Sequence, residues 1–405
     1  MVDYPKDWVE VELGDICSYL NGTSQEKNFT KYGRHKVISL GNYSESGKYL
    51  DDGNRINLSS VNKKYLVNSN ELCMVLNDKG NGRLVGKVIL IDEDNKYVIN
   101  QRTLKITFEK TKAYPKYMHK LINSRVFRLN LKDIIQGNTQ VYINPPMVMK
   151  MSINLPTLKE QKVIADTLST FDEHIENLEK LIEKKKMIRD GAVEDLMSGN
   201  TRLEGFDNNW EEKTILSITK DIITGGTPST NLKEYWGGSI PWLASTEIHQ
   251  KNIKNATKNI SNIGLHNSSA KIAPKYSVLI ALAGQGKTRG TAAILGKDMA
   301  INQSLAALVC SEDTYYKFLF YAIELNYEAL REISSGDGGR GGLNKKLIKY
   351  FKINIPSGVK EQQAIASVLS SMDEEIDCLQ KEKEKIEKLK QGAMDDLLTG
   401  KVRLV

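Results

Sequence analysis

Two short segments of the chain contain residue types with which enzymes handle nucleotides. Residues 144–147 read Asn-Pro-Pro-Met, close to the Asn-Pro-Pro-aromatic loop that holds an adenine base for methyl transfer. Met147 is a poor stacking partner for a base, and no Gly-rich loop for S-adenosylmethionine accompanies the motif. Prolines are also common in the first turn of a helix, where no N–H donor is needed. We therefore interpret 144–147 as the start of a helix and keep base methylation as the alternative.

The second segment, residues 281–288, ends in Gly-Lys-Thr after a run of β-branched residues, as a phosphate-binding loop would. Such a loop needs glycine at its first position, where the backbone adopts a positive φ, and Ala281 stands there instead. Residues 289–292 also lack the pattern of the amphipathic helix that should follow. ATP binding by this segment is therefore an alternative and not the favoured interpretation.

The polar loops of the two halves share a chemistry that is more informative than either motif. Glycine lets the backbone approach a polyanion closely, Arg and Lys bind phosphates or guanine, and Asn and Gln bind adenine. Each loop alone is equally well explained as a solvated hairpin, but loops that match between the halves favour DNA binding. The candidate DNA-binding residues are Lys79, Asn81, Arg83, Gln101, Arg102, Thr139, Gln140, Tyr142, Thr227, Gln285, Lys287, Arg289, Gln303, Arg340 and Asn344.

The chain consists of two similar halves. Residues 153–161, Ile-Asn-Leu-Pro-Thr-Leu-Lys-Glu-Gln, match residues 353–362, in which Ile-Asn-Ile-Pro and Lys-Glu-Gln recur. Further pairs in the same order are Asp172 and Asp373, Leu196 and Leu397, Gly199 and Gly400, Arg202 and Arg403 and, more loosely, Trp8 and Trp210, Gly22 and Gly226, and Asn100 and Asn302. This repeat predicts two similar tails and two front parts that have diverged towards different tasks.

The two tails are predicted to be long helices. From Ile164 to Ile182, apolar residues recur at alternating spacings of four and three, which is the a/d pattern of a coiled coil. Gly199 and Gly400 follow at positions where glycine typically ends a helix. A helix over 159–198 is roughly 60 Å long and needs a partner for its apolar seam. We expect the tails to pack on each other as a coiled coil. A bundle with the helices of another subunit is the alternative, and both arrangements can occur together.

Each front part is predicted to be an α+β domain. Short β-branched runs at 36–40, 86–91 and 276–282 are separated by Gly, Asn and Asp clusters, which indicates strands joined by turns. Helical patterns near 114–132 and 314–332 lie between these strands and the tails. The expected fold is a strongly curved sheet with long loops.

Composition excludes several classes of protein. The four cysteines and five histidines are scattered without the spacing of metal ligands, which predicts reduced thiols and a cytoplasmic protein. No apolar run approaches the roughly 20 residues of a membrane helix, and the first residues do not resemble a signal peptide. The net charge of +7 is compatible with an acidic polymer as partner but does not identify one.

The repeated tails and the Trp, Gly-Thr and Lys-Glu-Gln signatures resemble the specificity subunit of type I restriction-modification systems over essentially the whole chain. The resemblance implies an internal pseudo-two-fold repeat, with two variable target-recognition domains separated by two conserved helices that form an antiparallel coiled coil. The corresponding ranges are 1–158 and 201–358 for the domains, 159–200 for the central helix and 359–405 for the C-terminal helix.

The resemblance also implies a function and partners. The chain would recognise a bipartite double-stranded DNA target with an unread spacer, whose half-site centres lie roughly 10 bp apart if the helices relate the domains by a two-fold axis. Two modification subunits would methylate adenine, and up to two restriction subunits would cleave. No cofactor is expected in this chain, whereas S-adenosylmethionine, ATP and Mg²⁺ are expected in the partners.

The family's base-contacting residues differ between members, so no role is carried over to a candidate residue. This chain also departs from a perfect repeat, since Lys383 stands where Ile182 occupies the seam and the loop at 137–140 is not retained near Gly336. The alternatives to a recognition subunit are a free-standing DNA methyltransferase or NTPase, and a coiled-coil scaffold that does not touch DNA.

Overall fold

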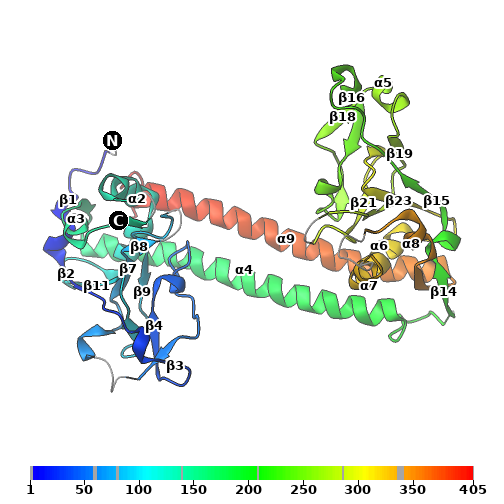
Figure 1. Ribbon diagram of the computed structural model, residues 1–405. Coiled ribbons are helices and arrows are strands. Elements are labelled where there is room, and N and C mark those ends of the chain that lie inside the picture. The colour runs from blue at the N-terminus through cyan, green and yellow to red at the C-terminus, as the bar shows by residue number, and fades with distance from the viewer. Residues whose placement is uncertain are drawn as a thin grey trace. The chain divides into compact units, whose positions relative to one another are not determined.

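The computed structural model describes residues 3–57, 62–78, 82–137, 140–207, 209–284, 287–334 and 342–404 (Figure 1). The chain forms two compact units. Unit 1 consists of residues 1–179 and 381–405, and unit 2 consists of residues 180–380. Two long helices, α4 (Leu158–Ser198) and α9 (Val359–Leu397), each contribute one part to unit 1 and the other part to unit 2. No helix among the described residues is long and apolar enough to cross a membrane.

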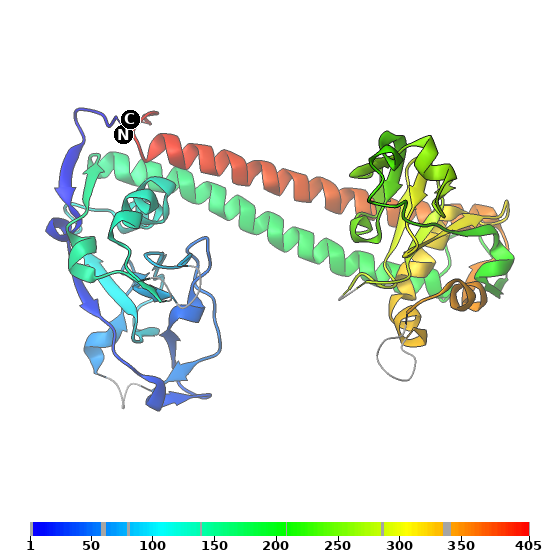
Figure 2. The ribbon, with the colours of Figure 1, turned by 45° about the horizontal axis from the view of Figure 1, so that its top comes forward.

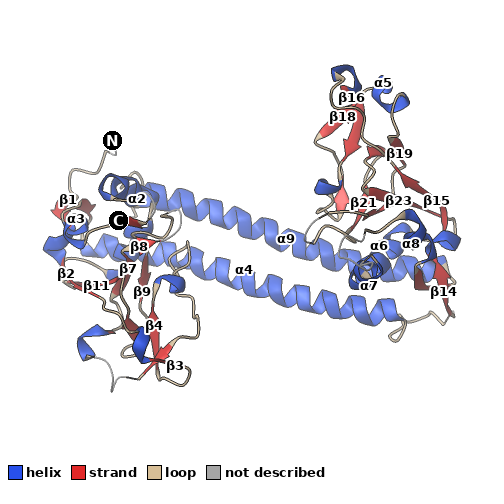
Figure 3. Ribbon diagram, viewed as in Figure 1, coloured by secondary structure: helices blue, strands red, loops and turns tan. Residues whose placement is uncertain are grey.

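The described residues that precede α4 form the front domain of unit 1, in which two main sheets combine with short helices (Figure 3). One sheet is antiparallel, in the order β2 (Cys17–Asn21), β11 (Thr103–Phe108), β7 (Leu72–Val75), β9 (Val88–Leu90). The other has the order β3 (Phe29–Thr30), β5 (Arg55–Ile56), β4 (His35–Ile38), β10 (Tyr97–Ile99), β6 (Leu66–Val67), with β10 parallel to β4. Two-stranded pairs join β1 (Val9–Glu12) to β13 (Ser152–Leu155) and β8 (Asn77–Asp78) to β12 (Val141–Tyr142). The helices are α1 (Pro115–Asn123), α2 (Arg125–Leu131) and α3 (Pro145–Met149).

The front domain of unit 2 repeats this plan with different loops. Its first sheet has the order β15 (Thr219–Thr224), β23 (Leu305–Cys310), β20 (Val278–Ala281), β21 (Ala292–Leu295), β17 (Asn252–Ile253). Its second has the order β18 (Lys258–Ile260), β16 (Trp236–Leu243), β22 (Met299–Ile301), β19 (Lys271–Ala273). The remaining elements are the pair β14 (Trp210–Thr214) and β24 (Lys352–Pro356), and helices α5 (Asn262–His266), α6 (Tyr316–Leu325), α7 (Tyr327–Ile333) and α8 (Lys345–Tyr350).

The core explains why these runs of residues become strands and helices. Leu72, Leu104 and Ile106 are fully buried between the first sheet of unit 1 and helix α1, whose Tyr117 is also buried. In unit 2, Val278, Ile280 and Leu308 form the same layer against the buried face of α6. Burying β-branched and aliphatic side chains on one sheet face is the main stabilising contribution in such a layer. The predicted α+β fold with a pseudo-two-fold repeat is confirmed.

Helices α4 and α9 run antiparallel in both units (Figure 2). In unit 1, Asp172 pairs with Lys390 at 2.5 Å and Glu179 pairs with Lys383 at 2.8 Å, so residue numbers rise along α4 as they fall along α9. In unit 2, Lys185 pairs with Glu375 at 2.7 Å in the same sense. The predicted seam residues Ile164, Leu168, Ile175, Leu178 and Ile182 of α4 are buried, and Phe171 is half-buried. The coiled-coil prediction is thus confirmed, and the charge at Lys383 is balanced by Glu179.

Both long helices end beside an aromatic side chain. Gly199 and Gly400 have φ values of +75° and +72°, a backbone conformation that favours glycine. A Cβ on Gly199 would lie 3.0 Å from the ring of Trp210, and one on Gly400 would lie 3.2 Å from the ring of Trp8 and 2.4 Å from Pro5. The predicted helix ends are confirmed, and glycine is needed there for both backbone and space.

The repeated Lys-Glu-Gln motif fastens the start of each helix. The glutamine side chain of Gln161 accepts from the Tyr114 N–H at 2.8 Å and donates to the Pro156 carbonyl at 3.0 Å. Gln362 makes the same two contacts in unit 2. The buried carboxylate of Glu160 pairs with Arg403, as that of Glu361 pairs with Arg202 in unit 2 at 2.8 and 2.9 Å.

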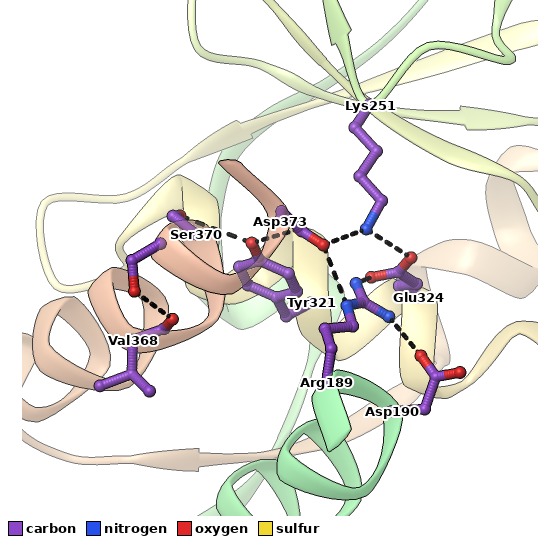
Figure 4. A network of polar contacts seen from close by, with 9 residues as sticks. Arg189, Asp190, Lys251, Tyr321, Glu324, Val368, Ser370 and Asp373 are labelled. Carbon is purple, nitrogen blue, oxygen red and sulfur yellow. Dashed lines mark hydrogen bonds and ion pairs between the residues drawn. The ribbon is translucent and has the colours of Figure 1, made fainter. Parts of the chain in front are cut away.

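A polar network attaches the front domain of unit 2 to the helix pair (Figure 4). Asp373 of α9 accepts from Arg189 Nε at 3.0 Å, from Lys251 Nζ at 2.7 Å and from the Tyr321 hydroxyl at 2.7 Å. Arg189 also binds Glu324 of α6. Each charge is thus paired, as burial in a helix junction requires.

Unit 1 has the corresponding network around Asp172. This carboxylate binds Lys120 of α1 and Lys390 of α9. In both units, then, a single aspartate joins the two long helices to the helix that follows the first sheet.

Candidate nucleic-acid interface

The predicted loops of unit 1 meet at the end of strand β7. The Leu76 N–H donates to the Arg102 carbonyl at 2.9 Å, and the Leu76 carbonyl accepts from the Ile143 N–H at 2.9 Å. The turn before β11, the loop after β7 and the segment before α3 therefore lie side by side. The pairing of β8 with β12 continues this arrangement, with Asn77 opposite Tyr142.

Unit 2 contains the same backbone ladder. The Leu282 N–H donates to the Ser304 carbonyl at 2.8 Å, and the Leu282 carbonyl accepts from the Leu343 N–H at 3.1 Å. The turn at 302–304, the loop after β20 and the segment before α8 are thereby brought together. Segments that are far apart in the sequence form one polar loop edge in each unit, and these two edges are the candidate interface.

In unit 1 the described candidates lie on this edge with their polar groups accessible. The Arg83 side chain is 69% exposed and lies 3.5 Å from Glu45. Gln101 donates to Glu26 at 2.5 Å, and the exposed Arg102 has a φ of +67°. Gln140 and Tyr142 are also exposed. A positive φ at a non-glycine residue is a strained conformation of the kind found at functional turns.

In unit 2 the described candidates also lie on the loop edge. The Thr227 hydroxyl donates to Gln303 at 2.7 Å, and both residues are exposed. Lys287 is exposed and Arg289 is half-buried in the loop after β20. The side-chain oxygen of Asn344 accepts from the N–H groups of Lys346 and Leu347 at 3.0 Å, so it caps helix α8. The remaining candidates, Lys79, Asn81, Thr139, Gln285 and Arg340, lie outside the described residues.

Two arginines that sequence reasoning missed hold the loops in place. Arg128 of α2 donates to the carbonyls of Val85 and Arg83 at 2.7 and 2.9 Å. Arg331 of α7 donates to the carbonyl of Arg289 at 3.3 Å. Their positions on matching helices could have identified them, but only an alignment of the divergent front parts would reveal that match.

Two buried asparagines support the turns that precede the loops. Asn100 accepts from the Gln25 N–H at 2.9 Å and donates to the Ser39 hydroxyl at 3.1 Å. Asn302 accepts from the Ser304 N–H at 3.1 Å. The sequence marked these residues as part of the repeat, and in the structure their side chains hold the turns in which Gln101 and Gln303 lie.

The two motifs that resemble enzyme loops have simple local structures. Asn144 precedes helix α3, and Pro145 and Pro146 occupy its first positions. Ala281 is the last residue of β20, and the chain then enters strand β21 at Ala292, whereas a phosphate-binding loop leads into a helix. Within the described ranges, no group of three or more His, Cys, Asp or Glu side chains could hold a metal ion.

Comparison with known proteins places these features in a family. A family model described as the type I restriction modification DNA specificity domain matches residues 5–185 and, a second time, residues 207–388. The putative type I restriction enzyme MjaX specificity subunit of Methanocaldococcus jannaschii is 25% identical over 99% of this chain and 95% of the relative. The HindI specificity subunit of Haemophilus influenzae is 23% identical over 88% of this chain and 90% of the relative.

The fold is similar to that of solved structures. The S subunit of a type I restriction-modification system from M. genitalium has a TM-score of 0.64 at 17% identity, covering 96% of both chains. A chain from a structure on complex assembly and conformational transition of the type I R-M system has a TM-score of 0.60 at 16% identity, covering 99% of this chain and 100% of the other.

Proposed function

This chain belongs to the family of type I restriction modification DNA specificity domains, and we propose that it reads a two-part DNA target, one half-site with each unit. DNA sequence recognition is the activity of this family. The observation that carries the two-part target is the backbone ladder at Leu76, which recurs at Leu282. One frame with different side chains, such as Arg102 in one unit and Ser304 in the other, suits two readers of different base sequences.

The two readers are residues 1–158 and 201–358 in this proposal, and an unread spacer separates their half-sites. The candidates on the loop edges act by two mechanisms. Arg83, Arg102, Lys287 and Arg289 bind phosphates or guanine, and Gln101, Gln140 and Gln303 bind adenine edges. Glu26 and Thr227 orient two of these amides in the free protein, because they hydrogen-bond Gln101 and Gln303.

We further propose that the chain is not itself a catalyst. The segment that resembles a methyltransferase loop is the start of helix α3, after Asn144. The segment that resembles a nucleotide-binding loop lies between strands β20 and β21. Adenine methylation then belongs to modification subunits that bind S-adenosylmethionine, and cleavage belongs to restriction subunits that use ATP and Mg²⁺.

The helix pair offers docking positions for two modification subunits. Ile188 of α4 is 49% exposed and Leu389 of α9 is 51% exposed, on helices whose other outward residues are mostly charged. The two residues occupy matching positions of the repeat, one in unit 2 and one in unit 1. An exposed aliphatic side chain at the same place in each unit suits a partner that binds twice. Up to two restriction subunits complete the proposed complex.

Methylome sequencing tests the two-part target. The chain and its modification subunit would be expressed together in a host that lacks adenine methylation. The expected result is a motif made of two short specific parts with a fixed run of unspecified bases between them. A contiguous motif would contradict the two-reader model, and methyl transfer by the purified chain that is lost in Asn144→Ala would contradict the absence of catalysis.

Loop variants test the interface residues. Arg83→Ala should weaken binding through unit 1, and Lys287→Ala and Arg289→Ala should weaken it through unit 2. A lost base contact costs about 1–3 kcal/mol and relaxes one position of the motif, whereas a lost phosphate contact weakens binding to all sequences. Wild-type affinity in all three variants would contradict a role in DNA binding and would favour the interpretation of these loops as solvated hairpins.

A further inference from the structure

A basic cavity opens beside the loop edge of unit 1. Its volume is about 770 Å³, and its described lining includes five basic side chains and no carboxylate. The basic residues are Arg83, Lys87, Arg125, Arg128 and Lys132. Gly82 and Val141 line the same cavity, so it adjoins both the loop after β7 and the segment that contains strand β12.

Most of the charge in the cavity has no counter-ion within the described part of unit 1. Arg128 donates hydrogen bonds to the carbonyls of Val85 and Arg83, and these neutral groups leave its positive charge unneutralised. Among the described residues, no carboxylate forms an ion pair with Lys87, Arg125 or Lys132. Within the described part of unit 1, the ion-pair partner of Arg83 is the exposed Glu45, at 3.5 Å. Like charges this close repel one another, and an anion in the cavity relieves the repulsion.

The excess of positive charge in the cavity affects the pKa of Lys87. Burial, together with the positive charge of Arg128, lowers the pKa of Lys87 from 10.5 to about 8. Its neighbours on other elements are Lys390 of α9, which lowers the pKa further, and Glu45, which raises it. A lysine held half-buried among cations is costly in a free protein and is suited to binding an anion.

We propose that this cavity binds a phosphate group of the DNA backbone next to the half-site read by unit 1. The inference rests on the proposed function, because it needs DNA on the loop edge. The cavity adjoins that edge through Gly82 and Arg83, so a bound phosphate would lie beside the bases that the loops read. Phosphate contacts fix the register of a protein on the duplex without reading sequence.

Among the described residues, unit 2 differs from unit 1 at one position of this site. Arg128 and Arg331 have the same role in the two units, since each donates to a carbonyl of its loop. Three residues before them stand Arg125 in unit 1 and Glu328 in unit 2. The carboxylate of Glu328 would repel a phosphate at the corresponding place, so the grip on the backbone is unequal between the half-sites.

The test measures binding of the full-length chain, in complex with its modification subunit, to a duplex that carries the methylated motif. Arg125→Ala and Lys132→Ala are suitable variants because both residues are exposed and neither side chain forms a hydrogen bond or an ion pair among the described residues. Each should lower affinity several-fold, by the same factor for the target and for duplexes with an altered base, and should reduce the salt slope by about one. Arg125→Glu, which copies unit 2, should lower affinity by a further factor.

Lys110→Ala is the matched control. Lys110 is an exposed lysine of the same unit, beyond the opposite end of β11 from Arg102, and its removal changes the net charge equally. It should leave affinity and salt slope at the wild-type values. Circular dichroism melting of every variant verifies that the fold is intact.

Neutral methylphosphonate linkages locate the phosphate. Substituted one at a time, they should weaken wild-type binding at a position flanking the unit 1 half-site, and the same substitution should cost the Arg125→Ala variant much less. Wild-type affinity and slope in both alanine variants, with target binding intact, would overturn the phosphate site and leave the proposed function standing. A wild-type complex that does not prefer its target would instead overturn the proposed function.

Discussion

Arg189 on α4 donates from Nε to a carboxylate oxygen of Asp373 on α9 at 3.0 Å, and the two side chains are only 9% and 16% exposed. Lys390 and Asp172 stand in the same relationship in unit 1, at 2.5 Å. The aspartates are the pair that the sequence repeat aligned. Each therefore serves as the point at which a front domain is attached to the helix pair.

Removal of one partner from this network should destabilise unit 2. Asp373→Asn removes one of the three carboxylates that pair with the mostly buried Arg189 and leaves Glu324 and the exposed Asp190. We expect a loss of about 3 kcal/mol in the free energy of unfolding, because the remaining buried charges are then incompletely paired. Urea titration of the full chain measures it. Lys220→Ala, which breaks the exposed pair with Glu312, is the control and should cost less than about 1 kcal/mol. Equal effects of the two variants would show that the network does not anchor the domain.

DNA binding should weaken as the pH rises through the pKa of Lys87. Because that pKa is about 8 in the free protein, Lys87 is mostly charged at pH 7 and mostly neutral at pH 9. A neutral Lys87 loses its attraction to a phosphate, so affinity should fall over this interval. Lys87→Arg keeps its charge at both pH values and should remove that part of the dependence. Anisotropy titrations at constant ionic strength measure it, and identical pH profiles for the wild type and Lys87→Arg would contradict the assignment.

Exchange of one front part should change one half of the target. Replacing residues 24–150 with the corresponding segment of a relative should alter the bases read by unit 1 and leave those read by unit 2 unchanged. The physical reason is that the ladder at Leu282 and the loops it joins belong entirely to unit 2. Methylome sequencing of the hybrid measures the outcome, and a simultaneous change of both half-sites would refute separate readers.

Charged substitutions on the exposed aliphatic positions should impair complex formation without affecting the fold. Leu389→Asp and Ile188→Asp place a charge where the proposed partner buries an aliphatic side chain, and each should weaken binding of one modification subunit at least tenfold. The double variant should bind none. Leu216→Asp, at an exposed aliphatic residue in the front domain of unit 2, is the control. Sedimentation of mixtures of the chain and the modification subunit counts the bound copies, and retention of both copies by the double variant would place docking elsewhere.

The tails were predictable because their signals are local. The 4-3 spacing of apolar residues from Ile164 to Ile182 indicates a helix that needs a partner helix. The glycines at 199 and 400 indicate where each long helix ends. The Lys-Glu-Gln repeat was visible as a pattern, but its meaning was not. That Gln161 satisfies the backbone of Tyr114, and that Glu160 pairs with Arg403, depends on segments that only folding brings together.

The loops of the candidate interface were predictable in composition, and their arrangement was less so. Side-chain chemistry identified the loops, and the ladders at Leu76 and Leu282 explain why they lie together. Arg128 was missed, and Asn100 was visible only as part of the repeat, because their partners are carbonyl and N–H groups, which nearly every residue carries and no pattern marks. Asn344 illustrates the converse, because an asparagine before a helix suits a cap as well as a base contact.

Arg128 donates to the carbonyls of Arg83 and Val85, and Arg331 donates to that of Arg289. The positions of the two loops therefore depend on backbone groups and not on the side chains that the loops carry. A carbonyl is present whichever amino acid occupies the position, so a mutation in the loop alters what it contacts and leaves the loop where it was. Under the proposed function, a single substitution in such a loop would change the bases that are read and would leave the fold intact. The hydrogen bonds of Arg128 and Arg331 to backbone carbonyls would thus let DNA specificity change while the positions of the loops stay fixed.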